Sequence, residues 1–322
     1  MLQLFFENGR EWFEFAGLIM AFVFTCVAMS CMKGILPKDA GREFAFNGKL
    51  SEGKPRGAGI LFELVFLIMA VIFGTLNFEI GAYLALITAE MLTGYLDDCS
   101  KTPWGEYKKG LLDLLIALLV AVTYLNFNPN TLTMPIFNTV VVIPPVIYGF
   151  LIVVLVWASI NVTNCADGVD GLSGTLSIVT LLTLYLIGTF VGRNDAFAYL
   201  IPLFVACLIA YLWYNATPSL LMMGDAGSRA MGIMIALAAL KTGCALLYIP
   251  AAIVLILDGG AGIVKVSLLR FLKIKVLVNV RTPLHDHVRK VWSWSNTQTV
   301  FRFAIIQTVI SVATLYVLQL VA

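Results

Sequence analysis

The sequence predicts an all-α fold, a polytopic membrane protein of about ten transmembrane helices. Of its 322 residues, 60% are hydrophobic and only 12% are charged, whereas a soluble domain carries roughly 25% charged residues. The mean hydropathy is +0.92, and apolar runs of about 20 residues, the length that crosses a bilayer, recur along the chain. We therefore expect one integral membrane domain over residues 1–322 rather than two soluble domains.

The apolar runs place the expected spans in chain order. They cover residues 12–33, 58–76, 78–96, 109–126, 140–160, 172–191, 196–214, 229–241, 243–272 and 300–321. The ninth run is long and contains Pro250, Gly259 and Gly260. Because proline and glycine interrupt membrane helices, this run predicts a bent ninth helix.

The basic residues predict how these spans are oriented. If the N-terminus lies outside, all but three of the 21 Lys and Arg fall on the cytoplasmic side, the exceptions being Arg10, Arg193 and Lys241. Cytoplasmic loops are enriched in Lys and Arg, so this distribution predicts that both termini lie outside. The same orientation places the unusual polar motifs of the chain on the cytoplasmic face.

The first polar motif, LDDCSK at residues 96–101, ends an apolar run on two adjacent carboxylates. In the simpler interpretation, Asp97 and Asp98 begin a solvated loop and Lys101 pairs with one of them. In the functional interpretation, the carboxylates share a hard cation. Mg²⁺ is commonly held by one or two carboxylates together with substrate phosphates.

The second motif, NVTNCADGVDGLSG at residues 161–174, follows the fifth expected span. Polar side chains recur there at every third position, namely Asn161, Asn164, Asp167 and Asp170. The glycines between them allow a ligand to approach the backbone closely, and the start of the next helix can bind an anion through its N–H groups. A helix cap would need only one Asp, so the pattern favours a binding loop.

Two further motifs lie on the same expected face. Asp225, in MMGDAGSR (222–229), precedes a helix that it could cap while also ligating a metal. The only two histidines of the chain, His285 and His287, both lie in PLHDH (283–287). Their spacing allows a zinc site, but no third ligand is apparent nearby. Basic residues close by favour contact with phosphate instead.

Acidic centres, glycine-bearing helix starts and basic residues on one face together indicate metal-assisted handling of phosphate groups. The membrane setting indicates that one substrate is a lipid. The alternative from another class is an ion-coupled transporter, because acidic residues inside spans are functional candidates. Those residues are Glu63, Glu79, Glu90 and Asp258. No internal repeat is visible and the motifs gather on one face rather than at the midplane, which favours the enzyme.

The four motifs, in this order, resemble those of the polyprenyl-phosphate N-acetylhexosamine-1-phosphate transferases. LDDCSK is similar to the family's DDxxK motif, and NVTNCADGVDGLSG is similar to NxxNxxDGxDGL. MMGDAGS resembles FMGD(T/S)GS, PLHDH resembles PLHHH, and WYNATP (213–218) resembles a WYN segment. The resemblance extends across about residues 50–290.

The resemblance implies a ten-helix fold with both termini periplasmic, in which the bent ninth helix helps to form a lipid groove. It implies Mg²⁺ as cofactor and undecaprenyl phosphate and UDP-MurNAc-pentapeptide as substrates, with lipid I and UMP as products. The setting would be peptidoglycan synthesis at the bacterial cytoplasmic (inner) membrane. The resemblance also implies a homodimer, inhibition by the nucleoside inhibitors of this family, and no nucleic-acid partner. A sibling enzyme that uses UDP-GlcNAc shares the general motifs, but PLH favours the muramyl donor.

Carried over by position, the resemblance implies catalytic roles for Asp97, Asp98, Asp225, His285 and His287. Asp225 is the first choice for a Mg²⁺ ligand, with Asp97 and Asp98 as further candidates. The implied substrate-binding residues are Lys101, Lys109, Asn161, Asn164, Asp167, Gly168, Val169, Asp170, Asn215 and Met222.

Within that set the resemblance implies separate tasks. The diphosphate region would be lined by Asn164 and Asp167, and uracil would be read by Asp170 with the backbone at 168–169. The two lysines would hold phosphate, and the remaining asparagines would support the cleft. The histidines would face the sugar-phosphate side.

The sequence departs from the family pattern at several positions. Asp286 replaces the middle histidine, and Met222 replaces an aromatic residue that can stack on uracil. GKPRGAG (53–59) stands where GTPTMGG is usual, while Lys265 and Asp258 replace Gln and Glu. These departures indicate a divergent branch with the same fold.

Overall fold

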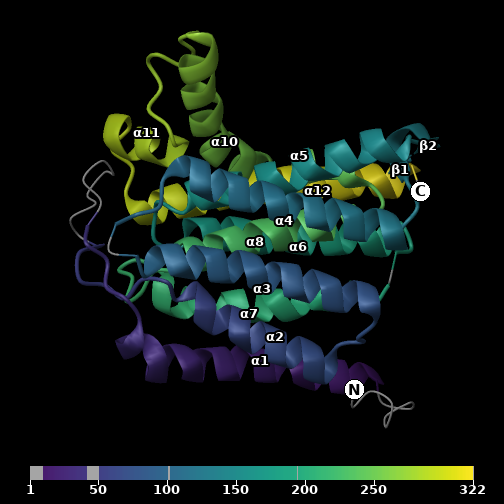
Figure 1. The fold of residues 1–322 in the computed structure, drawn as a ribbon, viewed down its shortest axis with the longest axis horizontal. Helices are drawn as coiled ribbons and strands as arrows, with labels where there is room; N and C mark the ends of the chain where they lie inside the picture. The colour runs from purple at the N-terminus through teal and green to yellow at the C-terminus, as the bar shows by residue number, and fades with distance from the viewer. Residues whose placement is uncertain (1–9, 42–50, 101, 194, 322) are drawn as a thin grey trace.

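The computed structural model describes residues 10–41, 51–100, 102–193 and 195–321. Most long helices lie side by side in a bundle, and α10 projects from it (Figure 1). The long helices are α1 (Arg10–Met32), α2 (Gly59–Phe73), α3 (Phe78–Asp98), α4 (Glu106–Phe127), α5 (Pro145–Ala166), α6 (Leu172–Phe190), α7 (Leu200–Asn215), α8 (Gly224–Lys241), α10 (Ile253–Ser267) and α12 (Asn296–Val321). The shorter elements are α9 (Tyr248–Ala251), α11 (Leu284–Val291), the π-helical turn Leu268–Leu272, the 3-10 turns Lys33–Ile35, Pro135–Phe137 and Ala245–Leu247, and the antiparallel strands β1 (Thr131–Met134) and β2 (Thr139–Val142).

The apolar helices of the described residues fit a membrane protein. Five are long and apolar enough to cross a bilayer, namely α1 with its 3-10 extension, α4, α5, α6 and α12. A sixth candidate is the bent pair formed by α9 and α10 with their flanking turns. Helices α2 and α7 are apolar but shorter. The chain is thus multi-pass, and the count of ten spans stays a prediction.

The region of the expected ninth span contains a sharp break. Residues Ala245–Ala251 and Ile253–Leu272 meet at 88°, and the break falls at Ala252, two residues after Pro250. Gly259 lies inside α10, where an added Cβ would be 2.1 Å from the carbonyl oxygen of Val162. The glycine that the sequence associated with the bend therefore serves close packing of α10 on α5, and the proline marks the break.

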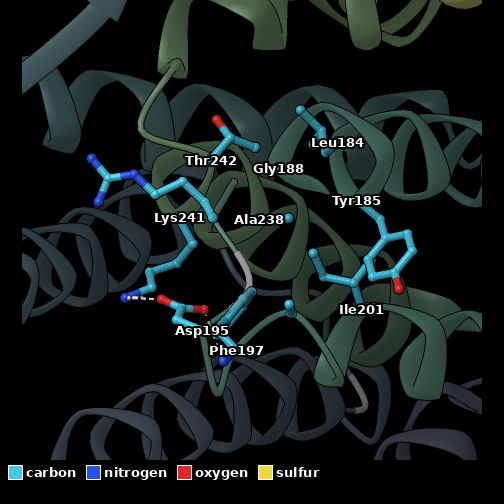
Figure 2. A pocket seen from close by; sticks show the side chains of 11 residues that line it. Leu184, Tyr185, Gly188, Asp195, Phe197, Ile201, Ala238, Lys241 and Thr242 are labelled. Atoms are coloured by element: carbon cyan, nitrogen blue, oxygen red, sulfur yellow. Dashed lines mark hydrogen bonds and ion pairs between the residues drawn. The ribbon is translucent and has the colours of Figure 1, made fainter. Parts of the chain in front are cut away.

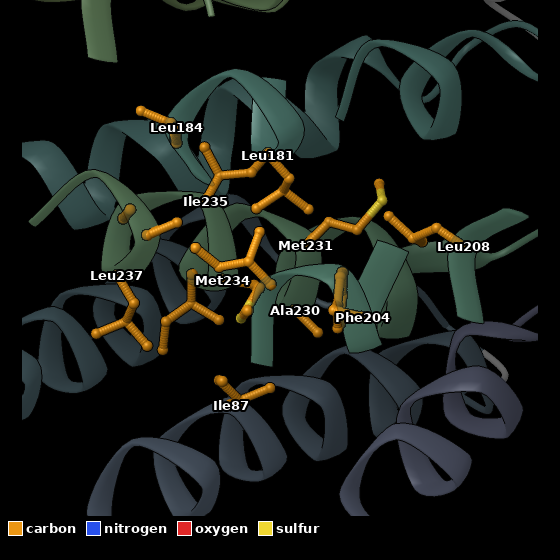
Figure 3. Packing of buried hydrophobic residues seen from close by; sticks show 14 of the residues in the cluster. Ile87, Leu181, Leu184, Phe204, Leu208, Ala230, Met231, Met234, Ile235 and Leu237 are labelled. Carbon is orange, nitrogen blue, oxygen red and sulfur yellow. The ribbon is translucent and has the colours of Figure 1, made fainter. Parts of the chain in front are cut away.

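Helix α8 lies at the centre of the bundle. All its residues from Gly224 to Leu240 are buried, and its apolar side chains pack against α3, α6 and α7 (Figure 3). The labelled residues of these neighbouring helices include Ile87 of α3, Leu181 of α6 and Phe204 of α7. A helix that is buried on all sides is held in place by every neighbour, so its first turn is a rigid place for a functional group.

Small residues let the helices around α8 come close. An added Cβ on Gly59 would lie 2.0 Å from the backbone nitrogen of Gly227, and one on Gly94 would lie 2.4 Å from the carbonyl oxygen of Asp225. Glycines at such contacts allow backbones to approach, as they do in membrane helix pairs. The start of α2 and the last turns of α3 therefore press directly on the first turn of α8.

Several motifs that the sequence placed in loops are helical. Asp98 is the last residue of α3, and Asp225 lies in the first turn of α8. Asn161 and Asn164 belong to the last two turns of α5, and PLHDH runs into α11. The apolar pattern ends at the first polar residue, whereas backbone hydrogen bonds carry each helix further. The fifth helix also begins later than residue 140, at Pro145, because the β1–β2 hairpin precedes it.

Candidate active site

Three predicted acidic residues meet where α3 ends and α8 begins. The carboxylate of Asp98 accepts hydrogen bonds from the backbone N–H groups of Asp225 and Ala226, at 3.1 Å each. Asp98 thus acts as a cap for α8 from another helix and places negative charge at its positive end. Gly224 makes this approach possible, because its φ is +68° and an added Cβ would lie 2.2 Å from Asp98 Oδ2.

Lys109 of α4 links the other two carboxylates. Its Nζ lies 2.9 Å from Asp225 Oδ2 and also forms an ion pair with Asp97 Oδ2. Asp97 in turn accepts a hydrogen bond from the backbone N–H of Trp104, at 2.7 Å, which orders the start of the following loop. The structure therefore brings together four of the predicted residues, one or two from each of three helices.

Arg56 is a second cation in this cluster, and the sequence reasoning did not assign it. Its guanidinium donates to Asp98 Oδ1 at 2.8 Å and also contacts Asp225 at 3.5 Å and Asp39 at 3.3 Å. The available signal was the departure GKPRGAG, which places an arginine in a glycine-rich loop. Two of its three partners, Asp98 and Asp225, lie 42 and 169 positions away in the sequence, so the departure alone did not reveal these contacts.

The surroundings of Asp98 and Asp225 shift the pKa values of these two residues in opposite directions. Burial, with the nearby Asp225 carboxylate adding to it, raises the pKa of Asp98 to about 6 against the opposing effect of Arg56. Burial alone would also raise the pKa of Asp225, but Lys109 and then Arg56 outweigh it and hold that pKa below its ordinary value. Asp225 is therefore kept as a carboxylate, the form that ligates a metal ion or accepts a hydrogen bond.

The donor set suits a hard divalent cation only in part. Oxygens of Asp97 and Asp225 converge on one point, which the Lys109 ammonium approaches. Within the described ranges, no group of three His, Cys, Asp or Glu side chains is arranged to hold a metal. Mg²⁺ is often bound by one or two carboxylates, with waters and substrate phosphates completing its shell. The two convergent carboxylates fit that mode, and they do not form a closed protein cage.

The loop after α5 is organised by its own polar side chains. Asn215 of α7 accepts a hydrogen bond from the N–H of Gly171 (2.8 Å) and donates to the carbonyl of Leu221 (2.8 Å). Asp167 accepts from the hydroxyl of Ser173 at 2.7 Å. Asn215 thus joins the loop after α5 to the segment before α8.

The polar residues around this loop reach separate partners. Asn164 donates to the hydroxyl of Ser228, one turn along α8 from Asp225, whereas Asn161 donates to Asp113 of α4 at 3.1 Å. Asp170 accepts from the N–H of Ser219 at 3.3 Å. The predicted residues of this motif therefore do not share one ligand set, and only Asn164 reaches toward the acidic cluster.

The remaining predicted residues of this region are placed as follows. Val169 is buried, and Lys54 approaches Asp170 at 3.9 Å while it donates to Ser219. Met222 is half-buried, and its backbone pairs with Pro55 and Ala58. Lys101 lies outside the described residues.

His285 is held against the loop at 167–171. Its Nδ1 lies 2.8 Å from Asp258 Oδ2, and its backbone N–H donates to Asp258 Oδ1 at 2.7 Å. On the other side of the ring, an added Cβ on Gly168 would lie 2.1 Å from Nε2. Asp258, which the sequence had marked only as a departure and as an intramembrane acid, therefore orients the histidine.

The two neighbours of His285 in α11 have different surroundings. Asp286 forms a 2.7 Å ion pair with Arg289 and lies 3.8 Å from Arg281. His287 Nδ1 accepts a hydrogen bond from the N–H of Arg281 at 3.2 Å, and its ring packs edge-on against Trp292. The replacement of a histidine by Asp286 thus supplies an acid that ties basic residues of this segment together.

Comparison with known proteins agrees with this arrangement. Residues 80–243 match glycosyl transferase family 4. A phospho-N-acetylmuramoyl-pentapeptide-transferase of Treponema pallidum (strain Nichols) is 40% identical over 319 residues, which cover 94% of this chain and 88% of the relative. Proteins of the same name from Dictyoglomus thermophilum and Ruegeria pomeroyi are each 27% identical, over 85% and 89% of this chain and 87% and 85% of their own lengths. The chain therefore belongs to glycosyl transferase family 4, in the group of the phospho-N-acetylmuramoyl-pentapeptide-transferases.

Proposed function

We propose that this protein transfers phospho-N-acetylmuramoyl-pentapeptide from its UDP carrier to undecaprenyl phosphate, forming lipid I and releasing UMP. The observation that carries the proposal is the convergence of Asp97, Asp98 and Asp225 with Lys109 and Arg56 at one end of the bundle. Such a set suits phosphoryl transfer, in which a protein mainly positions the reactants and stabilises charge. The 40% identity to the Treponema pallidum relative supports the muramyl donor.

The reaction requires an oxygen of the acceptor phosphate to attack the sugar-linked phosphorus of the donor. A new phosphorus–oxygen bond then joins acceptor and sugar phosphate, and the bond to the bridging oxygen breaks as UMP leaves. Lys109 and Arg56 place two cations beside the carboxylates, where they can bind the phosphate oxygens. Mg²⁺, when bound by Asp225 with Asp97, would supply further neutralisation of the diphosphate.

Other residues of the site bind and orient the donor in this proposal. Asp258 fixes the ring of His285 so that Nε2 faces the loop at Gly168, where the sugar-phosphate part would lie. Asp170, held beside Ser219 and Lys54, lies on the side proposed for uracil. The same uracil site would admit the nucleoside inhibitors of the family.

The proposal includes the expected membrane arrangement of ten spans in the bacterial inner membrane, with both termini outside and the site cytoplasmic. Helix α12 ends at the same end of the bundle at which α1 begins (Figure 1). Helix α3 runs in the same direction as α1, because α2 returns between them. The end of α3, with Asp97 and Asp98, therefore lies at the opposite end of the bundle from the start of α1, which supports this arrangement. A homodimer is proposed from family membership alone.

Three of the four acidic residues that suggested an ion-coupled transporter contact other polar side chains of the bundle. Glu79 pairs with Lys241 at 2.8 Å, and Glu90 lies 3.2 Å from the Arg229 guanidinium. Asp258 holds His285. Three of the four acids thus act inside polar contacts of the bundle, which supports the transferase over the transporter.

The test is UMP release by the purified protein with undecaprenyl phosphate and Mg²⁺. UDP-MurNAc-pentapeptide and UDP-GlcNAc are supplied in parallel, and EDTA serves as the control. Metal-dependent release from the muramyl donor alone is expected. Release from UDP-GlcNAc alone would transfer the protein to the sibling activity, and release from neither donor by a folded sample would overturn the proposed function.

A further inference from the structure

Three charged side chains are buried beneath the acidic cluster, and one of them, Arg229, contacts the other two. They are Glu90 of α3, Asp113 of α4 and Arg229 of α8, each at most 2% exposed. Arg229 Nε lies 3.2 Å from Glu90 Oε1, and another nitrogen of the same guanidinium donates to Asp113 Oδ1. Asn161 donates to the second oxygen of Asp113 at 3.1 Å. At this depth none of the three can contact a substrate phosphate.

Each member of this triad lies directly below one residue of the active site, on the same helix. Arg229 follows Asp225 by four residues, and Asp113 follows Lys109 by four residues. Glu90 precedes Asp97 by seven. Because an α-helix has 3.6 residues per turn, these spacings put each pair on one face, about one or two turns apart.

The guanidinium also contacts Lys109, the site residue of α4, directly. Arg229 Nη2 lies 3.4 Å from the carbonyl oxygen of Lys109, and Nη1 lies 3.4 Å from the hydroxyl of Thr93 on α3. The single side chain of Arg229 therefore connects α8 to α3 and α4, the two other helices that carry residues of the acidic cluster. A planar guanidinium with several fixed donors can hold such partners in one geometry, which a lysine ammonium cannot do.

A gain in folding stability does not explain why these charges are buried. Removing ions from water costs several kcal/mol per ion, and replacing a buried ion pair by well-packed apolar residues is often neutral or stabilising. What the triad does supply is a defined register, because the ion pairs form only when the three helices have one relative height and rotation. Active-site groups need that kind of support from the residues behind them.

We propose that the Glu90–Arg229–Asp113 triad is a positioning device that fixes Asp97, Lys109 and Asp225 relative to one another for the transfer reaction. This inference rests on the proposed function for its kinetic consequence. Its structural consequence, the geometry of the Lys109–Asp225 ion pair, does not depend on which reaction is catalysed.

The same three helices offer a matched control at their other end. Lys241 of α8 contacts Glu79 of α3 at 2.8 Å and Asn128, which caps the end of α4, at 2.9 Å. It also pairs with Asp195 at 2.7 Å (Figure 2). Lys241 is 16 residues after Asp225 in α8, a distance of about 24 Å along the helix. This outer cluster joins the same helices but lies far from the reacting groups.

The experiment compares an apolar triad variant, Glu90→Leu/Asp113→Leu/Arg229→Met, with the outer-cluster variant Glu79→Leu/Lys241→Met. The triad variant is expected to lower kcat by about 10- to 100-fold with the donor KM changed less than about threefold, because a misplacement of about 1 Å costs rate rather than binding. The outer-cluster variant is expected to keep kcat, even where its Tm falls as much. A triad variant that keeps wild-type kcat would overturn the proposal.

Arg229→Lys covers the case in which the apolar variant fails to fold. It keeps the buried charge but cannot hold Glu90 and Asp113 together, so kcat is again expected to fall at nearly unchanged Tm. Full activity of a folded Arg229→Lys protein would then refute the positioning role.

A structural readout separates this proposal from the proposed function. In cryo-electron microscopy maps of the proteins in nanodiscs, the 2.9 Å contact between Lys109 Nζ and Asp225 Oδ2 is expected to be lost in the triad or Arg229→Lys variant and kept in the outer-cluster variant. If the wild-type protein releases UMP from neither donor, the proposed function fails while this contact still decides the positioning role. An unchanged contact in the triad variant would overturn it.

Discussion

Asp98 of α3 caps the helix that presents Asp225, and this one relationship joins two of the motifs that the sequence singled out. The Asp98 carboxylate accepts the N–H groups of Asp225 and Ala226 at 3.1 Å, and its side chain is fully buried. A capping interaction within one helix is common, but here the cap comes from a neighbouring helix across a glycine contact. Asp98 therefore contributes to the site both a charge and a fixed position for its neighbour.

The two contributions of Asp98 should be separable by mutation. Asp98→Ala removes both, so it is expected to destabilise the protein by about 1 kcal/mol through the lost cap and to abolish UMP release. Asp98→Asn keeps an oxygen acceptor for the amides but loses the charge, so it should recover much of the Tm without recovering kcat. Thermal unfolding and turnover are measured on the same samples. Equal activity of Asp98→Asn and wild type would show that the charge is dispensable.

Asp225 is expected to be essential without being needed for folding. Asp225→Ala removes the carboxylate whose pKa Lys109 and Arg56 hold low, so turnover should be lost while the Tm stays near that of wild type. EDTA should abolish the activity of the wild-type protein, and added Mg²⁺ should restore it. The comparison is made across a Mg²⁺ titration. An Asp225→Ala protein that turns over at ordinary Mg²⁺ would contradict its assignment as a metal ligand.

The sequence predicted which acidic residues come together better than it predicted their basic partners. Asp97, Asp98 and Asp225 stand out locally because carboxylates are rare beside apolar runs, and the structure brings all three together with Lys109. Arg56 could not be assigned in this way, since it meets Asp225 across 169 positions of sequence. Such a contact depends on the packing of α2 and α3 against α8, which no local pattern encodes.

For Asp258 and Glu90, too, the sequence marked the residue but did not reveal its partner. An acid inside an apolar run predicts a functional site but not the kind of site. In the structure, Asp258 contacts His285 and Glu90 contacts Arg229. Each acid thus has a second side chain as its partner. The bend was predicted from Pro250 together with Gly259 and Gly260. The break lies two residues after Pro250, whereas Gly259 packs closely against α5.

Asp170 should affect recognition of the donor more than chemistry. It lies beside Ser219 and Lys54, and not in the acidic cluster formed by Asp97, Asp98 and Asp225. Asp170→Ala is therefore expected to raise the KM for the uridine donor by about tenfold, the loss of a charge-assisted hydrogen bond, with a smaller change in kcat. Initial rates at varied donor concentration provide the measurement. If KM stays at the wild-type value, Asp170 does not read uracil.

The contact between His285 and Gly168 gives the sharpest steric prediction. A methyl group at position 168 would lie 2.1 Å from His285 Nε2, and the ring cannot retreat because Asp258 holds its Nδ1 and its backbone N–H. Gly168→Ala is therefore expected to displace His285 and lower kcat by about 100-fold, as misplacement of a reacting group does.

Two further variants decide whether displacement of the histidine is the cause. Asp258→Asn should also lower kcat, because it weakens the contact that orients the ring, and the double variant should lose little more than Gly168→Ala alone, since both act through His285. Gly81→Ala in α3 is the matched control, because an added Cβ there meets nothing within 4 Å and its activity should equal that of wild type. Additive losses for Gly168→Ala and Asp258→Asn would indicate that the two residues act independently and that His285 is not their common target.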